Sequence, residues 1–159
     1  MTDFERLLGA LTAGGVEYIV IGGLAANAHG AIRTTRDVDV VYARSRTNLE
    51  RLEKTVAPLR PYLRGAPPGL PFKLDVATLA SGLNFTLTTD LGELDLLGEV
   101  AGGGGYDDLL PDSETLDLFG LTCRCLGLDG LIRVKRAAGR PKDFEAIAEL
   151  EALRQERRS

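Results

Sequence analysis

Two aspartates, Asp37 and Asp39, are separated by one residue at the start of the alternating run Asp37-Val-Asp-Val-Val-Tyr42. The alternation predicts a β-strand, and residues two apart on a strand point to the same face of the sheet. Two carboxylates held side by side repel each other unless a positive charge lies between them. Because Mg²⁺ and Mn²⁺ prefer hard oxygen ligands, this pair predicts a divalent-cation site that also holds substrate phosphates.

Two adjacent glycines, Gly22 and Gly23, end the run 16–21, whose β-branched residues predict a buried strand. A short helix is expected to begin near Leu24. Glycine lets backbone N–H groups approach a phosphate closely, and the N-terminus of a helix is electropositive. Taken alone, a glycine pair is usually a turn and Asp-x-Asp a solvated strand edge. The glycine pair would bind phosphate next to the cation that the two aspartates would hold. The two features together therefore predict phosphoryl or nucleotidyl transfer.

Other catalytic patterns are missing from the sequence. No Gly-Lys-Ser/Thr follows the glycines and Gly-x-Gly-x-x-Gly is absent, which excludes a Walker loop and a dinucleotide fingerprint. The single histidine, His29, is expected on a helix surface, and the lack of a nucleophile motif argues against a hydrolase triad. Cys123 and Cys125 share a predicted strand at or beyond the limit of disulfide geometry, so we expect unpaired cysteines and no structural zinc.

The sequence around these residues predicts helices and strands that follow one another along the chain. A capping box formed by Thr47 and Glu50 marks the start of one helix. Segment 58–71 holds five prolines and two glycines and is expected to be a loop or an edge connection with little regular structure. The expected helices are 4–11, 24–29, 47–56, 128–138 and 142–157, and the expected strands are 16–21, 37–42, 84–89, 93–97, 116–119 and 121–126.

This order predicts one domain over residues 1–159, of α/β (α+β) class, with a mixed sheet flanked by helices and a helical C-terminus. The core is expected over about 16–126 and the C-terminal helices over 128–157. The chain has 159 residues, of which 44% are hydrophobic, so it can bury a core.

The net charge of −4 and the pI of about 5.1 exclude binding of nucleic acid through bulk charge. A local basic segment remains, because residues 131–142 hold five basic side chains and no acid. The sequence has no apolar run long enough to span a bilayer and no signal-peptide pattern at its N-terminus, so we expect a cytoplasmic protein without a membrane partner.

The strand, the glycine pair, the short helix and the run Arg33-x-Thr35-x-Asp37-x-Asp39 together resemble the polymerase-beta-like nucleotidyltransferase superfamily. More narrowly, they resemble small bacterial proteins related to abortive-infection toxins. The resemblance implies a small nucleotidyltransferase fold with a mixed sheet. It also implies an NTP bound at the glycine motif, and two Mg²⁺ ions held by three carboxylates, of which Asp37 and Asp39 match the first two.

The third carboxylate is expected on a neighbouring strand, where Asp95 in Gly92-Glu-Leu-Asp-Leu-Leu97 matches best. Glu93 lies on the same face by alternation and is the fallback. Asp75 is a weaker candidate. A third carboxylate in this place either takes the proton of the acceptor or holds the metal that activates it. The other reading of Asp95, an exposed strand aspartate, stays open.

Lys135 falls on the apolar stripe of the predicted helix 128–138, so it either extends to solvent or reaches a charged partner such as a triphosphate. Together with Lys142 and Asp143 it resembles the C-terminal signature of the same group, in which these residues lie close to the nucleotide. Arg33 and Thr35 match the family pattern too, and are expected to contact phosphate or to fix the loop that aims the carboxylates.

The sequence thus predicts a metal-dependent nucleotidyltransferase with Mg²⁺ or Mn²⁺ as its cofactor. It would transfer the NMP moiety of an NTP to an acceptor hydroxyl and release pyrophosphate. The acceptor is left open among RNA, a protein side chain and a small molecule. The alternative is a non-catalytic nucleotide-binding or interaction protein, for instance one component of a toxin–antitoxin pair with a cognate protein partner.

Overall fold

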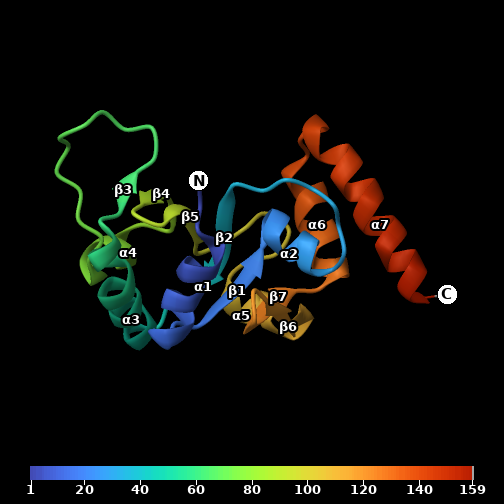
Figure 1. Cartoon of the computed structure of the whole chain (residues 1–159), viewed down its shortest axis with the longest axis horizontal. Helices are drawn as coiled ribbons and strands as arrows, with labels where there is room; N and C mark the ends of the chain where they lie inside the picture. The colour runs from blue at the N-terminus through green and yellow to red at the C-terminus, as the bar shows by residue number, and fades with distance from the viewer. Residues whose placement is uncertain (159) are drawn as a thin grey trace.

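The computed structural model describes residues 1–158 and contains a seven-stranded sheet with helices on both faces (Figure 1). The strands are β1 (Tyr18–Ile21), β2 (Asp37–Tyr42), β3 (Tyr62–Leu63), β4 (Asn84–Thr89), β5 (Gly92–Leu97), β6 (Ser113–Leu118) and β7 (Leu121–Leu126). The helices are α1 (Phe4–Ala13), α2 (Gly22–Ala28), α3 (Arg46–Val56), α4 (Val76–Ser81), α5 (Tyr106–Leu109), α6 (Leu128–Ala138) and α7 (Phe144–Arg158). Short 3₁₀ turns cover Ala57–Leu59, Leu110–Asp112 and Pro141–Asp143.

The sheet is mixed, as the sequence predicts. Its strand order is β3-β4-β5-β2-β1-β7-β6. The neighbours β2 and β5 run parallel, as do β1 and β7, whereas every other pair is antiparallel. The two hairpins β4–β5 and β6–β7 confirm the predicted hairpins, and the predicted fold class is confirmed.

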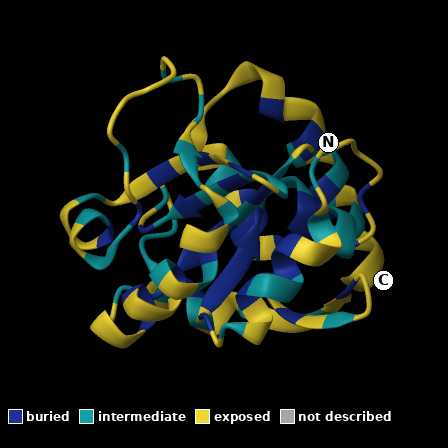
Figure 2. Ribbon diagram, turned by 60° about the vertical axis from the view of Figure 1, so that its left-hand side comes forward, coloured by how far each residue is buried: buried dark blue, intermediate teal, exposed yellow. Residues whose placement is uncertain are grey.

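Alternation on β2 and β5 separates an apolar face from a polar one. Val38 and Val40 on β2, and Leu94 and Leu96 on β5, are fully buried. They belong to one hydrophobic cluster with the buried leucines of α1 and α3, and the strands at the centre of the molecule are its most buried part (Figure 2). The residues between them point to the opposite face. Burial of the apolar face therefore fixes the direction in which the carboxylates of β2 and β5 point.

Helices α2, α6 and α7 lie on the carboxylate side of the sheet. Helix α2 contacts β1, β2 and α6, and α7 packs along α6 (Figure 1). The buried residues of α6 include Leu128, Leu131 and Ile132, and those of α7 include Ala146 and Leu150. No helix within residues 1–158 has the length and apolarity needed to cross a membrane.

Several local expectations are corrected by the structure. Helix α2 begins at Gly22 rather than near Leu24. Helix α3 is capped by Ser45, whose hydroxyl accepts a hydrogen bond from the backbone N–H of Asn48, so the Thr47 capping box does not form. His29 is buried and not on a helix surface, because its Nε2 lies 2.9 Å from the carbonyl oxygen of Leu126.

Segment 58–71 is mostly loop, as expected, but it also contains the edge strand β3, which pairs with β4. After β3 the chain forms a wide loop that projects from the body of the molecule before α4 begins (Figure 1). Helices α4 and α5 are short and were not expected from the sequence. The unpredicted β3 matters for the site, because it carries Arg64 to the sheet.

Asn48 provides a test of this architecture. It is fully buried, and its side chain accepts from the N–H of Glu17 and donates to the carbonyl oxygens of Glu17 and Ala43, at 2.7, 3.1 and 2.7 Å. Asn48→Ala removes the partner of the Glu17 N–H and of the Ala43 carbonyl oxygen, whereas the Glu17 carbonyl oxygen still accepts from the N–H of Ala43. We therefore expect the free energy of unfolding to fall by about 2–3 kcal/mol. Urea unfolding measures this. The exposed neighbour variant Thr47→Ala should change stability by less than about 0.5 kcal/mol, and equal losses in both would contradict the assignment.

Candidate active site

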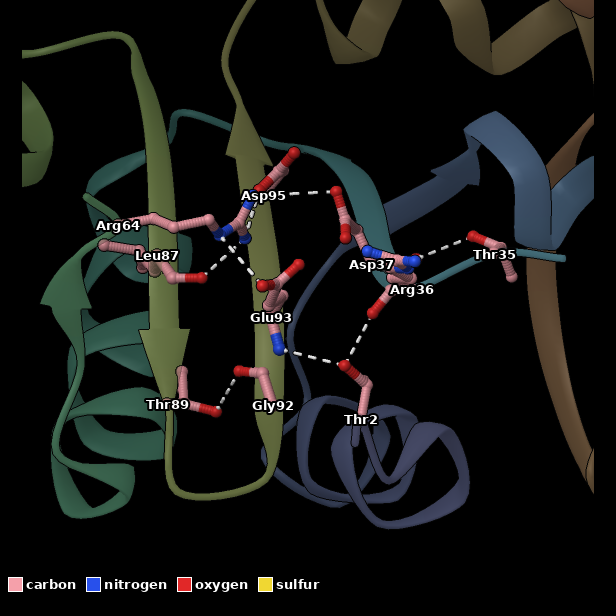
Figure 3. Close-up of polar contacts among 10 residues, drawn as sticks. All are labelled: Thr2, Thr35, Arg36, Asp37, Arg64, Leu87, Thr89, Gly92, Glu93 and Asp95. Atoms are coloured by element: carbon pink, nitrogen blue, oxygen red, sulfur yellow. Dashed lines mark hydrogen bonds and ion pairs between the residues drawn. The ribbon is translucent and has the colours of Figure 1, made fainter.

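Three carboxylates meet on the polar face of the sheet. Asp37 and Asp39 come from β2, and Asp95 comes from β5, whose parallel register places Asp95 directly opposite Asp39. One oxygen from each of the three lies within 4.8 Å of the other two. Asp37 and Asp95 point toward each other across the two strands (Figure 3). The structure thus brings together the three residues that the sequence suggests as metal ligands.

The carboxylates destabilise one another's charge. Burial, followed by the charge and hydrogen bond of Asp95 and the charge of Asp37, raises the pKa of Asp39 to about 7, and Arg64 opposes this rise only in part. Asp39 Oδ1 is buried and makes no hydrogen bond within the described chain. Such an orphaned, crowded carboxylate oxygen is what a bound cation would satisfy, so the residues present fit a divalent metal.

Gly22 is required by the proximity of α2 to Asp39. Its φ is +69°, and a Cβ at this position would collide with the Asp39 carboxylate. A Cβ on Gly23 would lie 2.9 Å from Thr35 Oγ1. Among residues 1–158, no side chain caps the start of α2, so its first backbone N–H groups are available beside the carboxylates. The glycine pair therefore opens space where an anion can contact the backbone.

A cleft of about 530 Å³ begins at the glycines and the carboxylates. Lys135 and Arg140 supply its positive charge. One wall is apolar and comes from β5 and α6. The lining includes Gly22, Gly23, Asp39, Asp95, Lys135, Arg140, Leu97, Val100, Leu131 and Val134. An anionic group with an attached apolar or aromatic part matches this combination of surfaces.

Asp143 fixes the two cations of the cleft. Its side chain is 7% exposed, and it pairs with Lys135 Nζ at 3.5 Å and with Arg140 Nε at 2.7 Å. Burial by itself would raise the pKa of Asp143, but the hydrogen bond from Arg140 and the charge of Lys135 leave it below its ordinary value. The carboxylate thus stays charged at neutral pH and positions Lys135 at the cleft.

Arg33 and Lys142 lie behind the glycine pair. Both line a smaller cavity of about 180 Å³ that Gly23 and Lys135 also border. Arg33 Nε donates to Glu149 on α7 at 2.8 Å, which ties the loop before β2 to the C-terminal helix. Of the two roles expected for Arg33, the structure shows contacts that fix the loop.

The two weaker candidates for the third carboxylate, Asp75 and Glu93, lie away from the triad or at its edge. Asp75 is the N-cap of α4, where its carboxylate accepts from the N–H of Thr78 at 2.8 Å, and it does not belong to the carboxylate cluster. Glu93 lies opposite Asp37, and its hydrogen-bond contact with Asp37 and its partial burial raise its pKa. Cys123 and Cys125 are unpaired, as the sequence predicts, and the structure buries both.

Sequence reasoning missed Arg64. Its guanidinium lies 2.8 Å from Asp95 Oδ1, 3.6 Å from Asp37 Oδ2 and 3.8 Å from Glu93 Oε1, and the three acids surround it (Figure 3). The only signal in the sequence is that Arg64 is one of two arginines, with Arg60, in segment 58–71, which carries no motif. Its position at the site depends on β3–β4 pairing, which a local pattern does not reveal.

Three solved structures share the fold over nearly their full lengths. The lincosamide antibiotic adenylyltransferase LnuA, bound to lincomycin, aligns with a TM-score of 0.60 and 15% identity, over 94% of this chain and 95% of that one. A provisionally assigned nucleotidyltransferase of Thermotoga maritima aligns with a TM-score of 0.59 and 13% identity, over 93% of each chain. ANT(2″)-Ia in complex with adenylyl-2″-tobramycin aligns with a TM-score of 0.56 and 18% identity, over 98% and 94%.

These likenesses confirm the nucleotidyltransferase fold that the sequence motif implies. The sequence itself matches no protein-family model and no curated protein sequence. The fold assignment therefore depends on the arrangement of the sheet and helices.

The raised pKa of Asp39 predicts pH-dependent metal binding. Because the folded carboxyl keeps its proton up to about pH 7, this group makes the metal-free protein less stable as pH rises from about 4 to about 7. A cation must displace that proton, so the affinity for Mn²⁺ should fall about tenfold or more between pH 8 and pH 5.5. Titration with Mn²⁺, followed by electron paramagnetic resonance, measures the affinity at each pH.

Asp39→Asn should weaken Mn²⁺ binding strongly and remove its dependence on pH. The exposed aspartate Asp117 on β6 gives the matched control, since Asp117→Asn should behave as the unchanged protein. Equal Mn²⁺ affinity at pH 5.5 and pH 8 in the unchanged protein would contradict the account of the triad.

Proposed function

We propose that the chain is a divalent-metal-dependent nucleotidyltransferase that transfers an NMP group from an NTP to an acceptor hydroxyl. One observation carries the proposal: Asp39 and Asp95 of the carboxylate triad, the glycine turn and Lys135 border the same cleft, and Asp37 completes the triad beside it. Carboxylates alone would suit a simple cation site, and the glycine turn alone would be a tight connection. Their juxtaposition suits a metal-bound polyphosphate.

Asp37, Asp39 and Asp95 are the residues that would hold Mg²⁺ or Mn²⁺. A bound cation at this place neutralises phosphate charge and lowers the pKa of an acceptor hydroxyl. The backbone N–H groups at Gly22 and Gly23 bind phosphate oxygens, and Lys135 supplies a further positive charge. Asp143 keeps Lys135 in place, and Arg33 ties the loop before β2 to α7. Thr35 and Lys142 stay predicted contacts of the nucleotide.

The reaction forms one bond and breaks one. The acceptor oxygen attacks the α-phosphorus, and the bond between that phosphorus and the bridging oxygen of pyrophosphate breaks. The hydroxyl proton passes to a carboxylate, for which Asp95 is placed best, because only one of its oxygens is held by Arg64. Pyrophosphate then leaves from the glycine side of the cleft.

A small hydroxylated molecule is the acceptor that we favour over RNA or a protein. Two of the fold neighbours are crystallised with small molecules, ANT(2″)-Ia with adenylyl-2″-tobramycin and LnuA with lincomycin. The cleft of about 530 Å³ has the size of a small-molecule site. The acidic net charge of −4 does not favour a long nucleic-acid footprint.

Incubation with α-³²P-labelled NTPs, Mg²⁺ and a panel of hydroxylated small molecules tests the function. Transfer should require the cation, and Asp37→Ala and Asp39→Ala should each lower kcat by at least about a thousandfold, because the phosphate charge is no longer neutralised. Asp117→Asn should retain full activity.

Labelling of RNA or protein from a cell extract, without labelling of small molecules, would overturn the acceptor class but not the reaction. If no acceptor is labelled and calorimetry detects no Mg²⁺-dependent NTP binding, the alternative of a non-catalytic interaction protein is favoured. Full activity in both aspartate variants would contradict the site assignment.

Lys135 tests the nucleotide side of the cleft. Lys135→Ala should raise the KM for the NTP about tenfold or more and change kcat less, because a phosphate contact present before the reaction is lost. Calorimetry with a non-hydrolysable NTP should show the same loss of affinity. The control is Arg136→Ala. Arg136 follows Lys135 on α6, and its truncation removes only an exposed ion pair with Glu151 of α7. An unchanged affinity in Lys135→Ala would place the triphosphate elsewhere.

A further inference from the structure

Arg64 reaches the carboxylates across a whole strand. Its backbone N–H donates to the carbonyl oxygen of Thr86 on β4 at 3.0 Å, and Thr86 lies opposite Asp95 on β5. The Arg64 side chain therefore crosses β4 on the polar face and ends at Asp95. Its Nη2 is held by the carbonyl oxygen of Leu87 at 2.6 Å and by Asp95 Oδ1 at 2.8 Å. Backbone and guanidinium are both anchored.

The guanidinium lies on one side of the carboxylate cluster. It faces Asp37 and Asp95, whereas the Asp39 oxygens lie on the side of Gly22. The Arg64 side chain is 23% exposed, and its Nε is buried without a hydrogen bond, 3.8 Å from Glu93. An unpaired buried N–H would be costly in most surroundings. Here it faces several negative charges, and the guanidinium offsets their repulsion.

We propose that Arg64 is a positioning residue and a built-in counter-ion of the triad. It turns the Asp95 carboxylate so that one oxygen remains directed to the cleft. It also supplies a permanent positive charge on the Asp37–Asp95 side, where it competes with a divalent cation for the same oxygens. This inference depends on the proposed metal-dependent transfer.

Loss of the Arg64 guanidinium should change cation affinity and catalytic rate in opposite directions. This difference distinguishes the proposed role from a merely structural one. Removing the guanidinium leaves the triad more negative, so a cation should bind more tightly. The same change frees the Asp95 side chain to adopt other rotamers, so catalysis should slow. A loss of local folding would instead weaken cation binding and slow catalysis together.

The test compares Arg64→Ala with Arg64→Lys and Arg60→Ala. Arg60 provides the matched control, because it belongs to the same segment and pairs with Asp90 at the exposed end of the β4–β5 hairpin. Mn²⁺ titration of the nucleotide-free protein gives the affinity without any reliance on activity. Thermal unfolding and far-UV circular dichroism show whether each variant is folded.

For Arg64→Ala we expect Mn²⁺ affinity to rise about tenfold and kcat to fall about tenfold or more, with little change in the KM for the NTP. Arg64→Lys keeps the charge but loses the planar fork, so its Mn²⁺ affinity should stay near that of the unchanged protein while kcat falls. Arg60→Ala should change neither quantity.

An unchanged or weaker Mn²⁺ affinity in folded Arg64→Ala would overturn the proposal. So would a rise in the KM for the NTP at constant kcat, because Arg64 would then be a phosphate ligand. If the unchanged protein transfers no nucleotide, the proposed function fails, and the Mn²⁺ titration of Arg64→Ala and Arg64→Lys still decides whether Arg64 is the counter-ion of the triad.

Discussion

Repulsion among the carboxylates of β2 and β5 is the constraint on which the rest of the site depends. The parallel register places Asp39 opposite Asp95 and Asp37 opposite Glu93, so four acids occupy two adjacent strands. Neither β2 nor β5 contains a basic residue that could offset this charge. The apolar residues between the acids are fully buried, which prevents the strands from turning the acids away. The core thus contributes the energy that holds an unfavourable electrostatic arrangement in place.

The neighbouring elements respond to that constraint in different ways. Arg64 places a guanidinium on one side of the acids, and Gly22 leaves space on the other side, where a larger residue would strike Asp39. Beyond the glycines, Asp143 holds Lys135 and Arg140 at the cleft. Positive charge therefore surrounds the triad without filling it. This is the arrangement in which a cation and a polyphosphate complete the balance of charge.

Much of this arrangement follows from local sequence, and some of it does not. Asp37 and Asp39 are recognisable because strand alternation is a local property, and the strand that carries Asp95 is recognisable because its hairpin has a short turn. Arg64 is not recognisable, because its place results from a two-residue edge strand that exists only through pairing with β4. His29 was misplaced for a similar reason, since its partner, the carbonyl group of Leu126, is distant in sequence. The positions of both residues depend on contacts between segments that are distant in sequence.

The most direct measurement is the anomalous scattering of Mn²⁺ in crystals grown with a non-hydrolysable NTP. The account predicts a peak coordinated by Asp37, Asp39, the Asp95 oxygen that Arg64 leaves free and a phosphate oxygen, with the polyphosphate against the backbone of Gly22 and Gly23. Arg64 should remain bound to Asp95 in the same crystals. A peak away from these aspartates, or a nucleotide outside the cleft that Lys135 lines, would contradict it.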